Sequence, residues 1–235
     1  ANIIRSGISF ITVLLLARWL GPEDYGRMAF LLATFLAFKQ LLDMASSSAF
    51  FTFLSQRQRS QRFVIFYWRW IAIQFLFSLF IIGLFLPDSM IDSVWKGESR
   101  LMVVLALVAT FMQQNVWVNA SRMAEAQRET IRVQRLNTLV MMIHLSVVVA
   151  LWLGGQLFLP FVFIALFIEW GIAGWLAARM YRGENERNNS SEYVEDSLAS
   201  VTKEFWCYCK PFIPYVWLGF AHDFADRWML QHWGG

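Results

Sequence analysis

Several ionisable side chains lie inside the long apolar stretches of this 235-residue chain. Burying a charge there costs free energy, so such residues often have a function. Counted from the ends of those stretches, five fall near the middle: Lys39, His144, Glu169, His222 and Asp223. A charged group at the centre of a bilayer costs about 3 kcal/mol, and it usually faces a protein interior or a water-filled cavity. The sequence therefore predicts one shared cavity at a common depth.

Cationic side chains in such a cavity can hold the phosphates of an anionic substrate through charge-assisted hydrogen bonds. Amides can serve sugar hydroxyls as donors and acceptors, although they more often join packed helices. The candidate substrate-binding residues are Arg18, Lys39, Asp43, Gln113, Gln114 and Arg227, with Asn115 at the depth of the two glutamines.

Histidine and carboxylate side chains suit the uptake and release of a proton, because imidazole titrates near neutral pH. The candidate ion-coupling residues are His144, Glu169, His222 and Asp223, with a proton or a sodium ion as the coupling ion. The structural alternative is that each charge is simply paired. In that alternative Lys39 pairs with Asp43, four residues later in the same helix, and His144 pairs with Glu169 of a neighbouring helix.

The sequence lacks the patterns of common enzyme and metal sites. It has no His/Cys cluster with metal-ligand spacing, no glycine-rich phosphate loop and no Ser/His/Asp motif. We therefore expect no catalytic residue, no metal and no cofactor, and a protein that is not an enzyme. Cys207 and Cys209 are too few for a disulfide scaffold, and we expect free, inert thiols.

The composition predicts an all-α integral membrane protein. Hydrophobic residues make up 57% of the chain and charged residues 16%, which leaves little polar surface to face water. Seven segments are long enough to cross about 30 Å as helices, at approximately 3–20, 27–54, 63–86, 101–121, 134–153, 158–179 and 211–232. None alternates like a barrel strand. The second is too long for one straight crossing, so it is expected to tilt, to bend near Ser46–Ser48 or to protrude.

The distribution of Lys and Arg predicts that the N-terminus is cytoplasmic. With that orientation the outer side receives Arg18, Arg27, Lys96 and Arg100, and Lys39 and Arg227 lie within membrane segments. The cytoplasmic side receives Arg5, Arg57, Arg59, Arg62, Arg69, Arg122, Arg128, Arg132, Arg135, Arg179, Arg182, Arg187, Lys203 and Lys210. This asymmetry explains the basic composition, so no nucleic-acid partner is expected.

One long polar stretch divides the chain. It predicts a cytoplasmic linker at 181–204, after a six-helix N-terminal lobe at 1–180 and before the start of a second lobe at 205–235. Because the chain begins inside one apolar run and stops after another, we expect an N-terminal fragment whose C-terminal half is a missing partner.

The stretch Leu14–Gly26, LLLARWLGPEDYG, predicts a helical hairpin. Gly21 permits a positive φ and Pro22 cannot continue the hydrogen-bond ladder, so the first helix ends there. The acidic pair Glu23–Asp24 then falls in the first turn of the second helix, where the helix dipole favours negative charge.

Three stretches, LLLARWLGPEDYGRMAFLLA, LLDMASSSAFFTFLSQ and ADRWMLQHWGG, resemble the polysaccharide exporter and O-antigen flippase family of the multidrug/oligosaccharidyl-lipid/polysaccharide exporter superfamily. The ARxLGPxxYG-like turn of that family corresponds to Ala17–Gly26. Its Leu-Asp-x-Gly-like step corresponds to Leu42–Ala45, with Ala where Gly is usual. The Asp-Arg pair of its seventh helix corresponds to Asp226–Arg227.

The resemblance implies twelve or more helices in two lobes, alternating access and a cationic central cavity. It implies a flippase that moves undecaprenyl-diphosphate-linked oligosaccharide across the bacterial inner membrane for surface polysaccharide synthesis. The expected partners are that substrate, membrane lipids, a coupling ion and the second half of the protein. Arg18 lies on the family's turn and is the best-supported cavity cation.

Two other functions remain open from the sequence. A multidrug or small-molecule exporter of the same superfamily predicts an acidic, aromatic cavity, which Arg18 and Lys39 disfavour. A membrane-embedded glycosyl- or acyltransferase needs a catalytic carboxylate or histidine set and a loop to hold its donor. The short predicted outer loops at Gly21–Gly26 and Gly154–Leu157 leave little room for one. A scaffold without transport activity is a further alternative.

Overall fold

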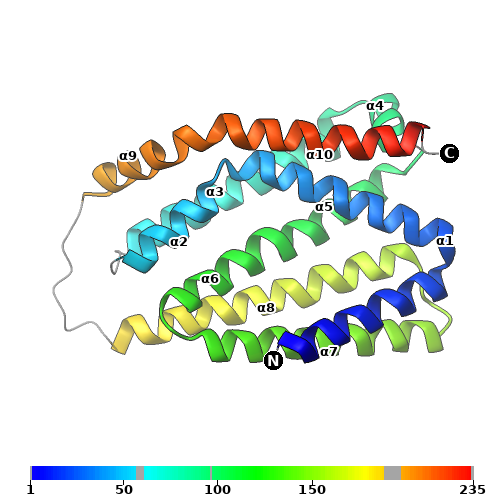
Figure 1. Ribbon diagram of the computed structural model, residues 1–235, viewed down its shortest axis with the longest axis horizontal. Coiled ribbons are helices and arrows are strands. Elements are labelled where there is room, and N and C mark those ends of the chain that lie inside the picture. The colour runs from blue at the N-terminus through cyan, green and yellow to red at the C-terminus, as the bar shows by residue number, and fades with distance from the viewer. Residues whose placement is uncertain (1, 57–60, 96, 188–196, 234–235) are drawn as a thin grey trace.

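The computed structural model of the chain describes residues 2–56, 61–95, 97–187 and 197–233, and within them every regular element is a helix. The α-helices are α1 (Asn2–Asp43), α2 (Ser46–Gln56), α3 (Gln61–Phe80), α4 (Asp88–Trp95), α5 (Arg100–Phe111), α6 (Val118–Ala126), α7 (Thr130–Leu153), α8 (Leu159–Arg187), α9 (Leu198–Cys209) and α10 (Ile213–Trp233). Short π-helical segments form η1 (Ile81–Phe85) and η2 (Met112–Trp117), and η3 (Lys210–Phe212) is a 3₁₀ turn. The long helices lie side by side in one bundle (Figure 1).

The first element, α1, consists of two helical arms that meet at Gly21. Gly21 has φ 81° and ψ 167°, a backbone conformation that residues with a Cβ rarely adopt. The chain turns back there, so the first arm (2–20) and the second arm (22–43) lie in different parts of the bundle (Figure 1). The first arm follows α7, where the rings of Trp19 and Trp152 stack with centroids 4.4 Å apart. The hairpin predicted from Gly21–Pro22 is confirmed.

A second break separates α1 from α2. Met44 and Ala45 both have positive φ, 46° and 62°, so the predicted segment 27–54 bends just before its serine run. Ala45 thus has the left-handed conformation that glycine adopts at the least cost. Gln74 of α3 donates to the carbonyl oxygen of Leu42 at 2.6 Å, which satisfies a group that the end of α1 leaves without a helical partner.

Within the described part of the chain, five helical stretches are long and apolar enough to cross a membrane: Ile3–Asp43, Gln61–Phe85, Arg100–Ala126, Thr130–Leu153 and Leu159–Met180. The first is 41 residues long and reverses at Gly21, so it contains two of the six crossings predicted for the N-terminal lobe. The seventh predicted segment, 211–232, forms α10, which packs along the second arm of α1 and is not among the five.

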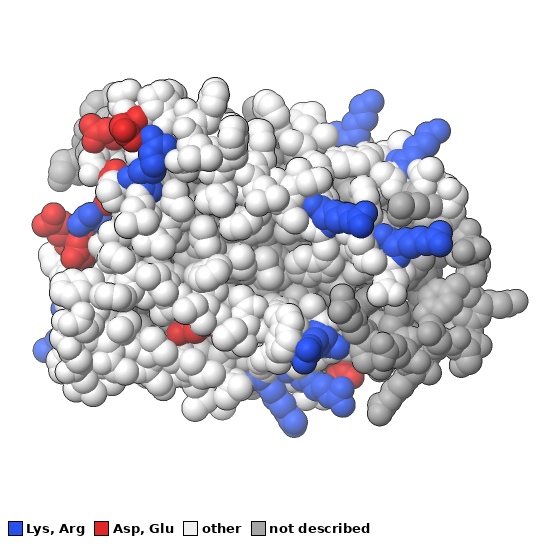
Figure 2. All heavy atoms as spheres, turned by 180° about the vertical axis from the view of Figure 1, so that it is seen from behind, with Lys and Arg blue, Asp and Glu red and all other residues white. Residues whose placement is uncertain are grey.

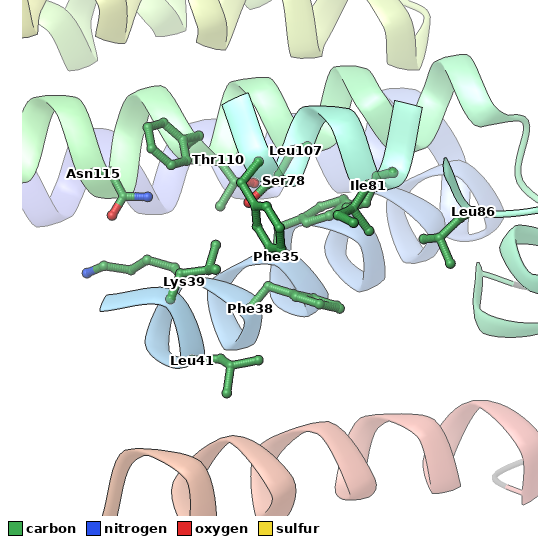
Figure 3. A pocket seen from close by; sticks show the side chains of 14 residues that line it. Phe35, Phe38, Lys39, Leu41, Ser78, Ile81, Leu86, Leu107, Thr110 and Asn115 are labelled. Carbon is green, nitrogen blue, oxygen red and sulfur yellow. The ribbon is translucent and has the colours of Figure 1, made fainter. Parts of the chain in front are cut away.

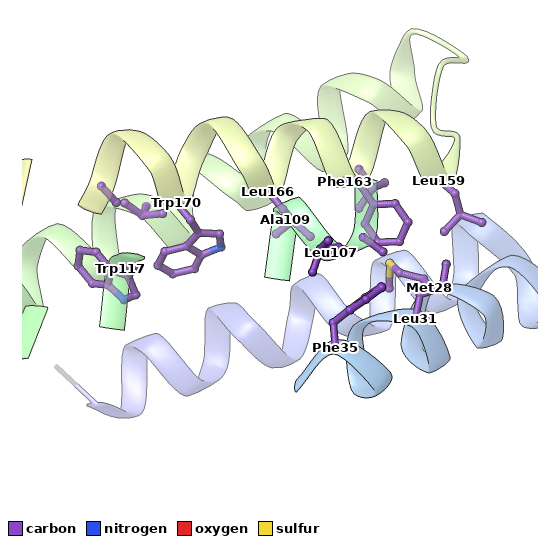
Figure 4. Close-up of a cluster of buried hydrophobic side chains, with 14 of the residues drawn as sticks. Met28, Leu31, Phe35, Leu107, Ala109, Trp117, Leu159, Phe163, Leu166 and Trp170 are labelled. Atoms are coloured by element: carbon purple, nitrogen blue, oxygen red, sulfur yellow. The ribbon is translucent and has the colours of Figure 1, made fainter. Parts of the chain in front are cut away.

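The centre of the bundle is held by close packing of α8 on α5 and η2. A Cβ at Gly174 would lie 2.7 Å from Cγ1 of Val116, so only glycine permits this approach. Trp117 and Trp170 pack nearby with ring centroids 5.4 Å apart. Further along, Phe163 packs among buried side chains of the second arm of α1, as Figure 4 shows.

Arginine side chains satisfy polar groups at the end of the bundle that holds the Gly21 turn. Arg100 donates to the carbonyl oxygens of Ile82, Gly83 and Leu86 at 2.7–3.1 Å, and it also contacts Asp88 at 2.6 Å. These carbonyls lie where η1 ends. In a membrane, leaving them without a hydrogen-bond donor would cost free energy. At the same end Arg27 forms an ion pair with the buried carboxylate of Glu98 at 2.6 Å.

Charge is distributed unequally between the two ends of the molecule. On the face in Figure 2, most Lys and Arg side chains lie toward one end and most Asp and Glu side chains toward the other. The helix order places the α6–α7 turn, the end of α8 and the start of α9 at one end, and the Gly21 turn, α4 and the α7–α8 turn at the other (Figure 1). Successive connections between the long helices thus lie at alternate ends of the bundle, as the predicted orientation requires. The side of the membrane itself remains a prediction.

The predicted linker at 181–204 is shorter than expected at both ends. Helix α8 continues to Arg187, and α9 already begins at Leu198, while residues 188–196 lie outside the described part of the chain. The buried side chains of Val201, Phe205 and Cys209 pack with those of α2 and α3. Their spacing of four residues is the signal of an amphipathic helix that the polar composition of this region concealed.

We predict that Gly21→Ala lowers the free energy of unfolding by about 1–3 kcal/mol, because alanine is strained at this φ and ψ. Nothing lies within 4 Å of the added Cβ, so the backbone alone causes the loss. The control is Gly26→Ala, which lies in the second arm with equally open space and should be neutral or slightly stabilising. SDS titration in mixed micelles, followed by tryptophan fluorescence, measures both. Equal stability of the two variants would contradict the strained turn.

Candidate functional site

The Lys39 cavity is an apolar void of about 160 Å³ between the second arm of α1, α3 with η1, and α5 with η2. Its walls include Phe35, Phe38, Phe77 and Leu107, and the half-buried Lys39 is its one charged side chain. Figure 3 shows Lys39 and Asn115 toward one end and Leu86 toward the other. The cavity is therefore amphipathic along its length.

Polar side chains share the wall of this cavity with Lys39. Asn115 is 3% exposed, and the buried hydroxyl of Thr110 has no hydrogen-bond partner among the described residues. Arg122 of α6 lies close enough to repel Lys39, whereas Asp43 attracts it. Two like charges held near each other favour the binding of an anion between them.

Asp43, a predicted substrate-binding residue, caps α2. Its Oδ1 accepts hydrogen bonds from the Ser47 amide at 3.0 Å and the Ser46 hydroxyl at 3.2 Å, and its Oδ2 accepts from the Ser47 hydroxyl at 2.8 Å. A carboxylate at the start of a helix satisfies an otherwise unpaired amide and interacts favourably with the helix dipole. The close partners of Asp43 are thus the start of α2, in place of the predicted ion pair with Lys39.

A chain of hydrogen bonds links α3 to α6 beside this cap. The Tyr67 hydroxyl donates to Asn119 Oδ1 at 2.9 Å, and the Asn119 amide donates to the Asn115 carbonyl oxygen at 2.7 Å. The Tyr67 ring also stacks on Phe50 of α2, with centroids 3.7 Å apart. This chain holds the helices around Lys39 in register, as polar contacts do between membrane helices.

His144 and Glu169 form the pair that the structural alternative predicted. His144 Nδ1 of α7 lies 2.7 Å from Glu169 Oε2 of α8, and their side chains are 15% and 7% exposed. Glu169 lines a groove between α7 and α8, and Lys39 is not part of the wall of that groove. The pair is therefore separate from the Lys39 cavity.

The other predicted ion-coupling residues lie on α10. Asp223 Oδ2 accepts a hydrogen bond from Gln40 of α1 at 3.2 Å, and His222 lies 3.6 Å from Asp223 and 3.9 Å from Asp226. The His222 side chain is 75% exposed. The contact between Gln40 and Asp223 attaches α10 to α1, whereas the contacts of His222 lie within α10. Arg227 belongs to α10, but its side chain lies outside the described part of the structure.

The remaining candidates are not near Lys39. Arg18 is exposed, three residues before the Gly21 turn, whereas Lys39 lies near the far end of the second arm. The 17 helical residues between Pro22 and Lys39 span roughly 25 Å. Gln113 and Gln114 are half-buried in η2 and are not part of the cavity wall.

The prediction of one shared cavity is therefore wrong. Lys39 lines one cavity, Glu169 lines another, Asp223 joins two helices and Arg18 lies at the opposite end. Two residues of the Lys39 site were missed as candidates: Thr110, which reads as an ordinary core residue, and Arg122, which the sequence assigns only to the orientation of the chain.

The cysteines match the expectation of free thiols. Cys207 is exposed and Cys209 is buried, and neither forms a disulfide. Burial, with a smaller contribution from Asp43, raises the pKa of Cys209 to about 12, so this thiol stays protonated and unreactive at neutral pH. Within the described residues, no group of three or more His, Cys, Asp or Glu side chains could hold a metal ion.

Comparison of the chain with protein-family models, curated proteins and solved structures finds no match. What the structure itself defines is the class of protein: an all-α membrane protein with five helical stretches able to span a bilayer. Inside this bundle, the Lys39 cavity carries a cationic side chain at one of its ends.

We predict that Asp43→Ala lowers the free energy of unfolding by about 1–2 kcal/mol, because α2 loses its cap. Asp43→Asn should keep most of the stability, since an asparagine oxygen caps nearly as well. Ser48→Ala, at an exposed position of the same helix, is the control and should change little. The same SDS titration distinguishes these outcomes. If Asp43→Asn were as damaging as Asp43→Ala, the charge of Asp43 and not its capping bonds would stabilise the fold.

Proposed function

We propose that this protein translocates an anionic, lipid-linked oligosaccharide across a membrane, with Lys39 binding the phosphate group. The observation that carries the proposal is the amphipathic character of the Lys39 cavity. An aromatic and aliphatic wall accepts part of an isoprenoid chain, and the Lys39 ammonium at one end accepts a phosphate.

The charge around Lys39 supports an anion as the bound group. Arg122 repels Lys39 and Asp43 attracts it, but the Asp43 carboxylate already accepts hydrogen bonds from the amide and hydroxyls of α2. A diphosphate would relieve this repulsion. The unpaired hydroxyl of Thr110 offers one further hydrogen bond.

The volume of the cavity limits what it can hold. At about 160 Å³ it accommodates one end of such a substrate, and the sugars must lie elsewhere. The resemblance to the O-antigen flippase family supplies the rest of the proposal: an undecaprenyl-diphosphate carrier, the bacterial inner membrane and a second lobe. Transport then requires that substrate and coupling ion bind the inward- and outward-open states unequally.

We predict that Lys39→Ala weakens binding of farnesyl diphosphate, a short isoprenoid diphosphate, at least tenfold in detergent micelles. Lys39→Arg should stay within about threefold, because the positive charge remains. The matched control is Lys210→Ala, an exposed lysine outside the cavity, which should leave binding unchanged. Isothermal titration with farnesyl diphosphate, and with farnesol as the uncharged analogue, measures the effect.

Transport is tested with the same variants in vesicles of phosphatidylethanolamine and phosphatidylglycerol. The wild-type chain should move a fluorescent polyprenyl-diphosphate sugar between leaflets, and Lys39→Ala should slow this at least tenfold. Equal binding of farnesol and farnesyl diphosphate by the wild type, or a Lys39→Ala variant that behaves like Lys210→Ala, would refute the role of Lys39.

A further inference from the structure

A second cavity, the α7–α8 groove, lies away from the Lys39 cavity. It has a volume of about 460 Å³, and its walls are mostly aliphatic side chains of the two helices. Ile143 of α7 and Ile164 and Ile168 of α8 are 44%, 38% and 48% exposed along it, so the groove is open at the surface of the bundle. In a bilayer this surface faces lipid.

Glu169 is the one polar side chain in the wall of this groove. It lies near the middle of the membrane-spanning stretch Leu159–Met180, and its side chain is 7% exposed. Oε2 is held by His144 at 2.7 Å, but the buried Oε1 has no hydrogen-bond partner within the described structure. A buried carboxylate oxygen without a donor has a desolvation cost that no hydrogen bond offsets.

An acyl chain in the groove would leave that cost in place, because it has no donor. An occupant that brings both an apolar chain and an N–H group would remove it. A positively charged head group is favoured further, because none of the described residues that line the groove is a Lys or Arg that would repel it.

We propose that the α7–α8 groove is a binding site for a lipophilic primary amine. The alkyl chain lies along Ile143, Ile164 and Ile168, and the ammonium group binds the Glu169 carboxylate, which His144 holds in position. The site differs in location and in charge preference from the Lys39 cavity, which suits an anion, and it does not depend on the function proposed for Lys39.

The test compares dodecylamine with dodecanol, which share a chain and differ in head group. Binding of each radiolabelled probe is measured with the full chain in phosphatidylcholine nanodiscs, with empty nanodiscs as background. The wild type should bind the amine at least tenfold more tightly than the alcohol. Glu169→Gln keeps the shape of the side chain but removes its charge, and this preference should fall below about twofold.

Two further variants complete the design. Glu23→Gln, at an exposed carboxylate outside the groove, should leave the preference unchanged. Ala165→Phe fills the groove without altering the carboxylate and should weaken binding of both probes, so it decides the matter if Glu169→Gln fails to fold. Equal binding of amine and alcohol by the wild type, a preference that survives Glu169→Gln, or unchanged binding by Ala165→Phe would overturn the proposal.

Discussion

Inside a bilayer no water is available to bond a backbone amide or carbonyl, so the chain can leave the helical conformation only where a side chain replaces the lost bond. The breaks in this protein follow that constraint. Gln74 donates to the Leu42 carbonyl where α1 ends, Asp43 accepts from the Ser47 amide at the start of α2, and Arg100 donates to the carbonyls where η1 ends. The Lys39 cavity lies beside these breaks, because its wall is built from the last turn of α1 and the π-helical segments.

The polar residues of the bundle fall into two groups: those that bond to other protein groups and those that line a cavity. Asp43, Gln74, Tyr67 and Asn119 are engaged with other protein groups and fix the helices in place. Lys39 and Glu169 are different, since each lines a cavity. Lys39 is repelled by Arg122, and the buried Oε1 of Glu169 has no hydrogen-bond partner within the described structure. A lysine lines one cavity and a glutamate lines the other, so we expect the first to bind an anionic ligand and the second a cationic one.

Much of the fold could be predicted because it depends on local chemistry. Gly21–Pro22 dictates a turn, and apolar length dictates the crossings. The site was harder, because depth along a helix says nothing of the face a residue occupies. A π-helical turn adds a residue and shifts all later side chains by about 100°, which no 3.6-residue count anticipates. Asn115 therefore reaches the cavity while Gln113 and Gln114 do not.

The central claim is that α1 crosses the membrane twice, and side-specific labelling of single cysteines tests it most directly. In a background with Cys207 and Cys209 replaced by serine, cysteines are placed at the exposed positions Ser6, Glu23 and Ser55. An impermeant maleimide should label positions 6 and 55 from one side of a sealed vesicle, and position 23 from the other. Labelling of positions 6 and 55 from opposite sides would show a single crossing and contradict the account.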